Sequence, residues 1–212
     1  MGDRGFDRAA AVRWALGGGA LLAALLFNYW TGTYVDRIGP TLLPARDLLF
    51  EILPYRTSPY VHSWGFAGFL AVLTFGVARY EPRERVPFFL WAYGLIVFTR
   101  AFFTVLTPLG VPPEAPTFAD FPLRPVLRYF DFRHTFFFSG HTAFPFLGFL
   151  LLRRPWVRWA CLGFSLLLAG SVLLSRLHYS IDVGAAFFIA YAVAGLSRRS
   201  WRSLLLGLGA RA

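Results

Sequence analysis

Six apolar stretches of bilayer-spanning length divide this chain of 212 residues, and each is bounded by arginine, proline or aspartate. A helix needs about 20 mostly apolar residues to cross the hydrocarbon core of a membrane. We therefore predict six transmembrane helices, over residues 12–33, 62–80, 87–108, 135–152, 156–176 and 181–197. No segment alternates as a β-barrel strand would. The expected fold class is an all-α membrane protein, with one domain over residues 1–212.

The composition excludes two other classes of chain. Hydrophobic residues make up 57% and charged residues 15%, whereas soluble domains carry about a quarter charged residues and disordered chains combine low hydrophobicity with high charge. The single cysteine, Cys161, excludes an intramolecular disulfide framework and a cysteine-based zinc site. It lies mid-helix, where packing is its expected role.

The net charge of +10 comes entirely from arginine, because all 21 basic residues are arginines. The aromatic residues lie inside the apolar runs, so we expect membrane topology rather than nucleic-acid binding to explain this charge. Alternating spans place thirteen arginines and four acids on one side: Arg4, Arg8, Arg13, Arg79, Arg83, Arg85, Arg153, Arg154, Arg158, Arg198, Arg199, Arg202, Arg211, Asp3, Asp7, Glu81 and Glu84. The other side has six of each: Arg37, Arg46, Arg56, Arg124, Arg128, Arg133, Asp36, Asp47, Glu51, Glu114, Asp120 and Asp131.

The positive-inside rule assigns the arginine-rich side to the cytoplasm. We therefore expect both termini to be cytoplasmic and the loops 34–61 and 109–134 to face the exoplasmic side. Exclusive use of arginine and short loops suggest a bacterial protein of the inner (plasma) membrane. Three charges remain within or at the ends of apolar runs, namely Arg100, Arg176 and Asp182. Ionisable groups in such places are expensive and are functional candidates.

Two polar motifs interrupt the later spans. Ser139-Gly140-His141-Thr142 opens the fourth, and Ser175-Arg176-Leu177-His178-Tyr179-Ser180-Ile181-Asp182-Val183 joins the fifth to the sixth. The predicted topology brings His141, His178 and Asp182 to the exoplasmic ends of their helices, together with Arg100. None of these residues was used to derive the topology, so their convergence is independent support for a site.

This set of residues suits phosphoryl transfer. Imidazole is both a nucleophile and a proton carrier near neutral pH. His178 and Asp182 are spaced i, i+4, so on a helix the carboxylate can fix one ring nitrogen while the other attacks phosphorus. His141 can protonate the departing oxygen. Arg100 and Arg176 can neutralise phosphoryl oxygens. This scheme needs no cofactor and no metal, and the neighbouring arginines disfavour the alternative of a metal held by the two histidines and the aspartate.

The motifs resemble those of the lipid phosphatase/phosphotransferase superfamily, which contains the type 2 phosphatidic acid phosphatases and the sphingomyelin synthases. The nearer similarity is to the sphingomyelin synthase-related branch, which carries Ser-Gly-His-Thr and His-Tyr-Thr-x-Asp-Val and an arginine before a Thr-rich helix end. The resemblance covers about residues 95–195, which we expect to be the catalytic core. It implies six helices, an exoplasmic site, His141, His178 and Asp182 as catalytic triad, and a phosphohistidine-type intermediate without metal. Ser139 and Gly140 then join Arg100 and Arg176 as candidate phosphate contacts.

Two further residues are candidates for contact with a lipid headgroup. His134 lies seven residues before His141, which on one helix would place both on nearly the same face. Arg133 precedes it, and for both residues a plain loop position is the favoured interpretation. Arg133-His134-Thr135 stands where the synthases carry Cys-Gly-Asp, so the resemblance does not extend to their headgroup selection. His62, at the start of the second span, is expected to be an interfacial residue.

We therefore expect a membrane-embedded lipid phosphatase or phosphotransferase. Its partners would be a phospholipid or lipid-phosphate donor, a lipid hydroxyl or water as acceptor, and the bilayer, with no nucleic acid. One alternative is a lipid transporter or structural membrane protein with a vestigial site. Another is an intramembrane protease using Ser139 and His178, but position 137 is phenylalanine where such a nucleophile motif has glycine.

Overall fold

The computed structural model describes residues 8–112, 114–117, 121–122 and 132–207. Over these residues the chain is helical and contains no strand, which confirms the all-α prediction. Five helices are long and apolar enough to cross a membrane: α1 (Arg8–Ile38), α3 (Pro59–Tyr80), α4 (Val86–Leu106), α7 (Pro155–Leu174) and α8 (Ser180–Gly207). The shorter elements are η1 (Gly39–Thr41), α2 (Leu48–Ile52), η2 (Arg83–Arg85) and α6 (Gly140–Leu151).

The fourth predicted span differs from the prediction. Its helix, α6, has only 12 residues, or about 18 Å of a hydrocarbon core about 30 Å thick. Residues 135–139 are not helical, and α4 satisfies their carbonyl groups: Arg100 Nε donates to Phe138 O at 3.0 Å and Thr104 Oγ1 to Phe137 O at 2.9 Å. Irregular backbone at membrane depth is tolerated where protein groups satisfy it in this way. A full crossing by this segment stays a prediction.

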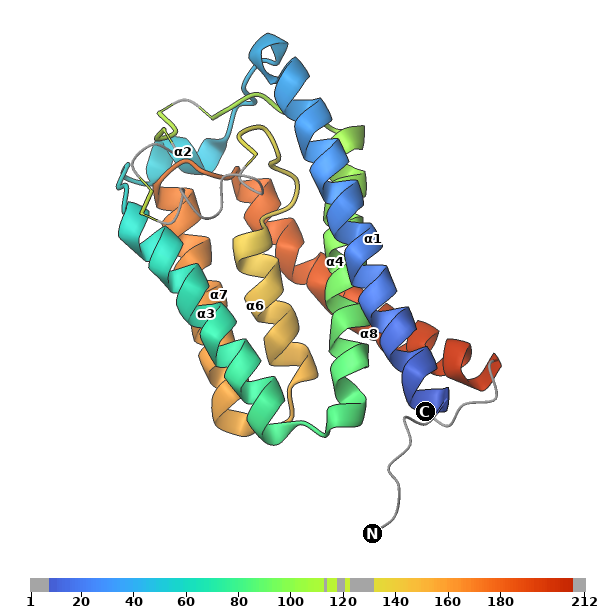
Figure 1. The fold of residues 1–212 in the computed structure, drawn as a ribbon. Coiled ribbons are helices and arrows are strands. Elements are labelled where there is room, and N and C mark those ends of the chain that lie inside the picture. The colour runs from blue at the N-terminus through green and yellow to red at the C-terminus, as the bar shows by residue number, and fades with distance from the viewer. Residues whose placement is uncertain (1–7, 113, 118–120, 123–131, 208–212) are drawn as a thin grey trace.

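The short helix α6 lies at the centre of the bundle (Figure 1), where it packs against α7 and α8 and also contacts α3 and α4. One fully buried side chain from each of these five helices joins the same core, namely Phe69, Ile96, Leu147, Cys161 and Ala190. The predicted packing role of Cys161 is therefore confirmed. The remaining long helix, α1, packs along α4.

Large apolar side chains cover the outside of the long helices. Leu26 on α1, Leu166 on α7 and Phe188 on α8 are all more than half exposed. A soluble monomer rarely presents apolar patches on this scale. Together with the five helices of spanning length, they support a multi-pass membrane protein.

The two ends of the bundle differ in composition. The start of α1 and the end of α8 lie at one end (Figure 1), together with the arginines of the α3–α4 and α6–α7 connections. The opposite end gathers α2 and the starts of α3, α6 and α8. All the predicted site residues within helices lie near this second end. Its assignment to the exoplasmic side remains a prediction.

A glycine contact holds α1 against α4. A Cβ atom added to Gly17 would overlap the backbone of Pro87, and one added to Gly94 would lie 2.9 Å from Leu21 N. The neighbouring Gly18 and Gly19 face open space. Only the first glycine of the Gly17-Gly18-Gly19 run therefore makes close helix contact.

We predict that Gly17→Leu destabilises the protein by about 1–3 kcal/mol, because the added side chain must separate α1 from α4. Thermal unfolding of the purified protein in detergent measures this. Gly18→Leu is the matched control and should unfold at the wild-type temperature. Equal stability of the two variants would contradict the glycine contact.

Candidate active site

The chain reversal between α7 and α8 positions His178. Helix α7 ends at Ser175 as its C-cap, Arg176 adopts a left-handed backbone with φ of 56°, and Leu177 N donates to Val172 O at 2.9 Å. Arg176 N also donates to Leu173 O. These two bonds form a Schellman motif, in which glycine usually occupies the left-handed position. The motif stops α7 abruptly and turns the chain toward the start of α8.

His178 and Asp182 are brought together, but not by the helical spacing that we predicted. His178 precedes α8, whose first residue is Ser180. Asp182 Oδ2 accepts a hydrogen bond from Tyr179 N at 3.0 Å and lies 3.4 Å from His178 Nδ1. The carboxylate thus reaches back over the N-cap, as the acidic residue of a capping box does. The predicted pair is present, and its physical cause is helix capping.

The start of α6 is tied to the same place. Ser139 N donates to the backbone carbonyl of Asp182 at 3.1 Å, which puts His141, the second residue of α6, beside the His178 turn. Arg100 and His178 both lie within electrostatic range of His141, and Asp182 within range of Arg100. The structure therefore groups the four residues whose convergence the sequence predicted.

Asp182 is fully buried. Its Oδ2 has the two partners described above, whereas Oδ1 has no hydrogen-bond partner in the part of the chain that the structure describes. An unpaired carboxylate oxygen in a low-dielectric interior is costly. Arg100, within electrostatic range of Asp182, is a positive group that can offset that cost.

Arg100 already has partners in this structure. Besides Phe138 O, its guanidinium binds the backbone carbonyl and the hydroxyl of Thr135. Its Nε lies 3.6 Å from the point that a Cβ on Gly140 would occupy, so the guanidinium borders the start of α6. Nη1 takes no part in these bonds. Phosphate binding by Arg100 or Gly140 stays a prediction that this position permits.

Ser139 faces the protein interior. Its side chain is fully buried, and Oγ accepts a hydrogen bond from Thr142 Oγ1 at 3.3 Å. Ser165 on α7 in turn donates to Thr142 O at 2.8 Å. These bonds tie the first turn of α6 to α7, which gives Ser139 a packing role beside its predicted contact with phosphate.

Arg176 binds the end of α2. Its Nη2 donates to Phe50 O at 2.7 Å and to Leu53 O at 2.8 Å, and the guanidinium carbon lies 4.4 Å from the centre of the Phe50 ring. Nε lies 3.9 Å from Glu114 Oε2, and Nη1 is buried with no hydrogen-bond partner among the described residues. The main contact that the structure gives Arg176 is thus the segment around α2, which leaves Nη1 as the free nitrogen for its predicted phosphate contact.

A second carboxylate, Asp47, joins α2 to α8. Its Oδ1 accepts from Leu49 N at 2.9 Å, capping α2, and its Oδ2 accepts from Ser180 N at 2.6 Å. Tyr179 also binds the segment before α2. Its hydroxyl accepts a hydrogen bond from Ala45 N at 3.0 Å and donates one to Gly110 O at 2.9 Å. Burial, reinforced by the charges of Asp182 and Asp47 and partly opposed by the Ala45 N–H, raises the pKa of Tyr179, so its hydroxyl keeps its proton.

The two headgroup candidates lie in a loop bound to the end of α1. Asp36 accepts hydrogen bonds from Arg133 N at 3.1 Å and from His134 N at 2.8 Å, and its Oδ1 is 3.0 Å from His134 Nδ1. Helix α6 begins at Gly140, so the argument that His134 and His141 share a helix face was wrong. His134 anchors the loop, whereas the exposed side chain of Arg133 is free of these bonds.

His62 is the site residue that the sequence argument missed. Its ring centre lies 3.9 Å from that of His141, and Phe66, one turn further along α3, lies 4.5 Å from His141. His62 Nδ1 is buried without a hydrogen-bond partner. The first turn of α3 carries no motif, and only its predicted end of the membrane could have suggested this neighbour.

Within the residues that the structure describes, no group of three His, Cys, Asp or Glu side chains is arranged to hold a metal ion. Comparison with known proteins assigns no function either, since no protein-family model, no curated protein and no solved structure matches the chain. The chemistry of the site must therefore be argued from its residues.

We predict that Arg176→Gly releases α2. Glycine adopts the left-handed backbone without strain, so the turn should persist while the bonds to Phe50 O and Leu53 O disappear. Hydrogen exchange of residues 47–56 should become faster. Arg176→Ala should lose the same bonds and a further 1 kcal/mol or so of stability to backbone strain. Unchanged exchange in both variants would show that Arg176 does not hold α2.

We also predict that His62 shields the ring of His141. In His62→Ala, His141 should react faster with diethyl pyrocarbonate, whereas His62→Phe keeps a ring in contact and should react at nearly the wild-type rate. Peptide mapping by mass spectrometry separates His141 from the other histidines. Equal reactivity in all three proteins would contradict this contact.

Proposed function

We propose that the protein is an integral-membrane enzyme that transfers or hydrolyses the phosphoryl or phosphodiester group of a lipid at the exoplasmic leaflet. The observation that carries this proposal is the grouping of His141, the His178–Asp182 pair and Arg100 at one end of an apolar helical bundle. The motif resemblance to the sphingomyelin synthase-related branch supports the same chemistry.

In the first half-reaction His178 is the nucleophile. Its Nδ1 faces Asp182, which leaves Nε2, on the opposite edge of the ring, to attack phosphorus. The bond between phosphorus and the leaving lipid alcohol breaks, and protonated His141 gives its proton to that oxygen. General acid catalysis of this kind contributes about 10²–10⁴-fold. Asp182 stabilises the positive charge that develops on the His178 ring.

In the second half-reaction the phosphohistidine is cleared. Water or a lipid hydroxyl attacks phosphorus, His141 takes the proton of the attacking hydroxyl, and the bond from phosphorus to His178 Nε2 breaks. Arg100 is proposed to neutralise the phosphoryl oxygens, where fixed donors stabilise developing charge. The same residues serve hydrolysis and transfer, and the accepting hydroxyl decides between them.

The surroundings of the site favour a lipid substrate. Leu48 and Ile52 on α2 are 66% and 76% exposed, and Tyr60 and Trp64 at the start of α3 are also largely exposed. These apolar side chains belong to the same end of the bundle as the histidines. An amphipathic segment of this kind lies naturally at a membrane interface.

The alternatives explain fewer of these observations. An intramembrane serine protease would need Ser139 Oγ to be activated by His178, but the hydrogen bond that the structure gives this oxygen comes from Thr142. A non-catalytic lipid transporter would not require a carboxylate held against His178. Capping of α8 accounts for Oδ2, but the buried Oδ1 has no partner among the described residues, and a role in catalysis accounts for that cost.

The test is a lipid screen read by mass spectrometry. Wild type and His178→Ala would each be incubated with phosphatidylcholine, phosphatidylethanolamine, phosphatidylglycerol, phosphatidic acid and ceramide, without added metal. We expect a product from wild type that falls by about 10³-fold or more in His178→Ala and in His141→Ala. A new phospholipid would mean transfer, whereas diacylglycerol with free phosphate or a released phospho-headgroup would mean hydrolysis.

Two controls separate the mechanism from its rivals. Ser139→Ala should keep part of the activity, because a phosphotransferase does not use this hydroxyl as nucleophile. Chelator should leave turnover unchanged. Wild-type rates in either histidine variant would refute the mechanism, and inhibition by chelator that a divalent ion reverses would replace it with a metal-dependent one.

A further inference from the structure

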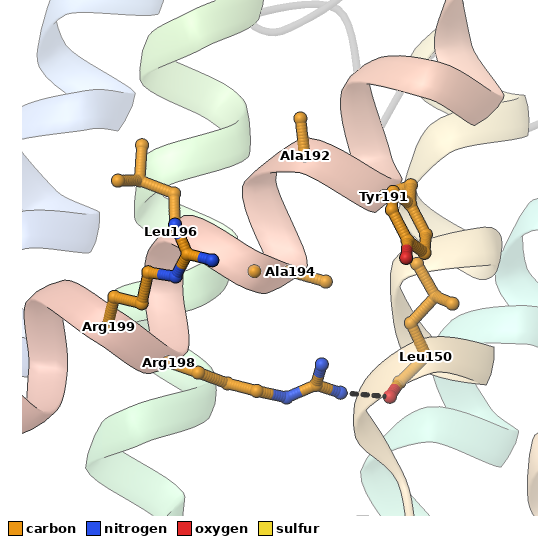
Figure 2. A pocket seen from close by; sticks show the side chains of 8 residues that line it. Leu150, Tyr191, Ala192, Ala194, Leu196, Arg198 and Arg199 are labelled. Carbon is orange, nitrogen blue, oxygen red and sulfur yellow. Dashed lines mark hydrogen bonds between the residues drawn. The ribbon is translucent and has the colours of Figure 1, made fainter.

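A groove opens at the end of the bundle opposite the histidines (Figure 2). It lies between the last turn of α6 and the second half of α8, and its volume is about 350 Å³. Leu150, Tyr191 and Leu196 give it an apolar lining, and Arg198 and Arg199 give it a charged border. Residues from two helices thus create a site with one apolar part and one cationic part.

The two arginines differ in how they are held. Arg198 Nη2 donates to Leu150 O at 2.6 Å, so its guanidinium extends from α8 toward α6 (Figure 2). This bond uses one nitrogen and leaves the other donors of the planar group for a ligand. Arg199 is exposed and directly follows Arg198. Two guanidinium groups at the border of one groove suit the oxygens of a phosphate.

Among the residues that the structure describes, arginines outnumber acids around the groove. Arg85 and Arg153 form a positive cluster with Arg198, since both Arg153 and Arg198 act electrostatically on Arg85. Among the described acids of these connections, the buried Glu81 already binds the side chain of Arg85 and accepts from Arg153 N at 2.9 Å, and Glu84 is exposed beside Arg83 and Arg85. The excess positive charge favours an anionic ligand over a zwitterionic one.

The groove has the polarity profile of a membrane interface. Tyr191 lies seven residues before Arg198, about 10 Å deeper along α8 and within its apolar section. Leu196 and Tyr191 are 53% and 71% exposed toward the surroundings of the bundle. A molecule lying in the groove would therefore place an apolar chain beside Tyr191 and an anion beside the arginines.

We propose that this groove binds an anionic phospholipid, with its phosphate between Arg198 and Arg199 and one acyl chain along Leu196 and Tyr191. This second lipid site is separate from the histidine cluster and does not depend on the proposed catalysis. The positive charge of Arg198 and Arg199 would also hold the C-terminal part of α8 at the surface of an anionic leaflet.

Gly195 provides a way to fill the groove without disturbing the fold. It lines the groove, and a Cβ added there meets no atom within 4 Å. Gly195→Leu should therefore occupy the space of the acyl chain while the helices keep their packing. Gly163 on α7 is a matched control, because a Cβ at that position also meets open space and lies outside the groove.

The experiment is native mass spectrometry of the full chain in a neutral detergent, titrated with phosphatidylglycerol, phosphatidylcholine or inorganic phosphate. We expect wild type to retain one more phosphatidylglycerol than Gly195→Leu, and Gly163→Leu to match wild type. Arg198→Gln and Arg199→Gln should each bind that lipid about tenfold more weakly, since each loses a charge-assisted contact. Arg83→Gln, which removes an exposed arginine outside the groove, should bind normally.

Three results would overturn the proposal. Equal retention of phosphatidylcholine and phosphatidylglycerol would show that the arginines do not select charge. Binding of inorganic phosphate as strong as that of the lipid would show an anion site without a lipid groove. Unchanged stoichiometry in Gly195→Leu would place the bound lipid elsewhere. This experiment measures binding and not turnover, so it tests the proposed lipid groove even if the lipid screen finds no catalytic product.

Discussion

The contacts of the buried residue Asp182 hold together the parts of this end of the bundle that carry the two histidines. Its carboxylate caps α8 through Tyr179 N and faces His178, and its backbone carbonyl holds the start of α6 through Ser139 N. Removing one partner of a buried charge is strongly destabilising. Asp182, which faces the proposed nucleophile, therefore also sets the relative position of α6 and α8. A substitution of Asp182 would change the stability of the protein and the proposed chemistry together.

The long helices were predictable because burial in lipid requires an unbroken apolar run, and such a run is visible in the sequence. The convergence of His141, His178, Asp182 and Arg100 was predictable from the alternation of spans. The non-helical conformation of residues 135–139 was not predictable, because an apolar aromatic run in a sequence is typical of a membrane helix. The cause lies in distant residues, since Arg100 and Thr104 of α4 bind the carbonyl groups of this segment. His62 was missed for a similar reason, since ring packing between helices leaves no trace in local sequence.

Arginine performs three different tasks in this chain. Exposed arginines at one end supply the charge bias that is expected to orient the protein. Arg100 and Arg176 use several donors at once to satisfy backbone carbonyls that no helix satisfies. Arg198 binds Leu150 O through one nitrogen and keeps its other donors for the proposed ligand. A guanidinium suits all three because it stays charged and offers five hydrogen-bond donors, which lysine does not.

The segment around α2 has a consequence for the reactants. Asp47, Tyr179 and Arg176 fix it to the turn that carries His178, and that histidine is only 7% exposed although it lies at the end of the bundle. Water thus has little direct access to the proposed nucleophile. If reactants instead arrive sideways through the bilayer, a lipid hydroxyl has a more direct path than water to the proposed phosphohistidine. The balance between water and a lipid hydroxyl as acceptor would then depend on how firmly the five-residue helix α2 is held against the His178 turn.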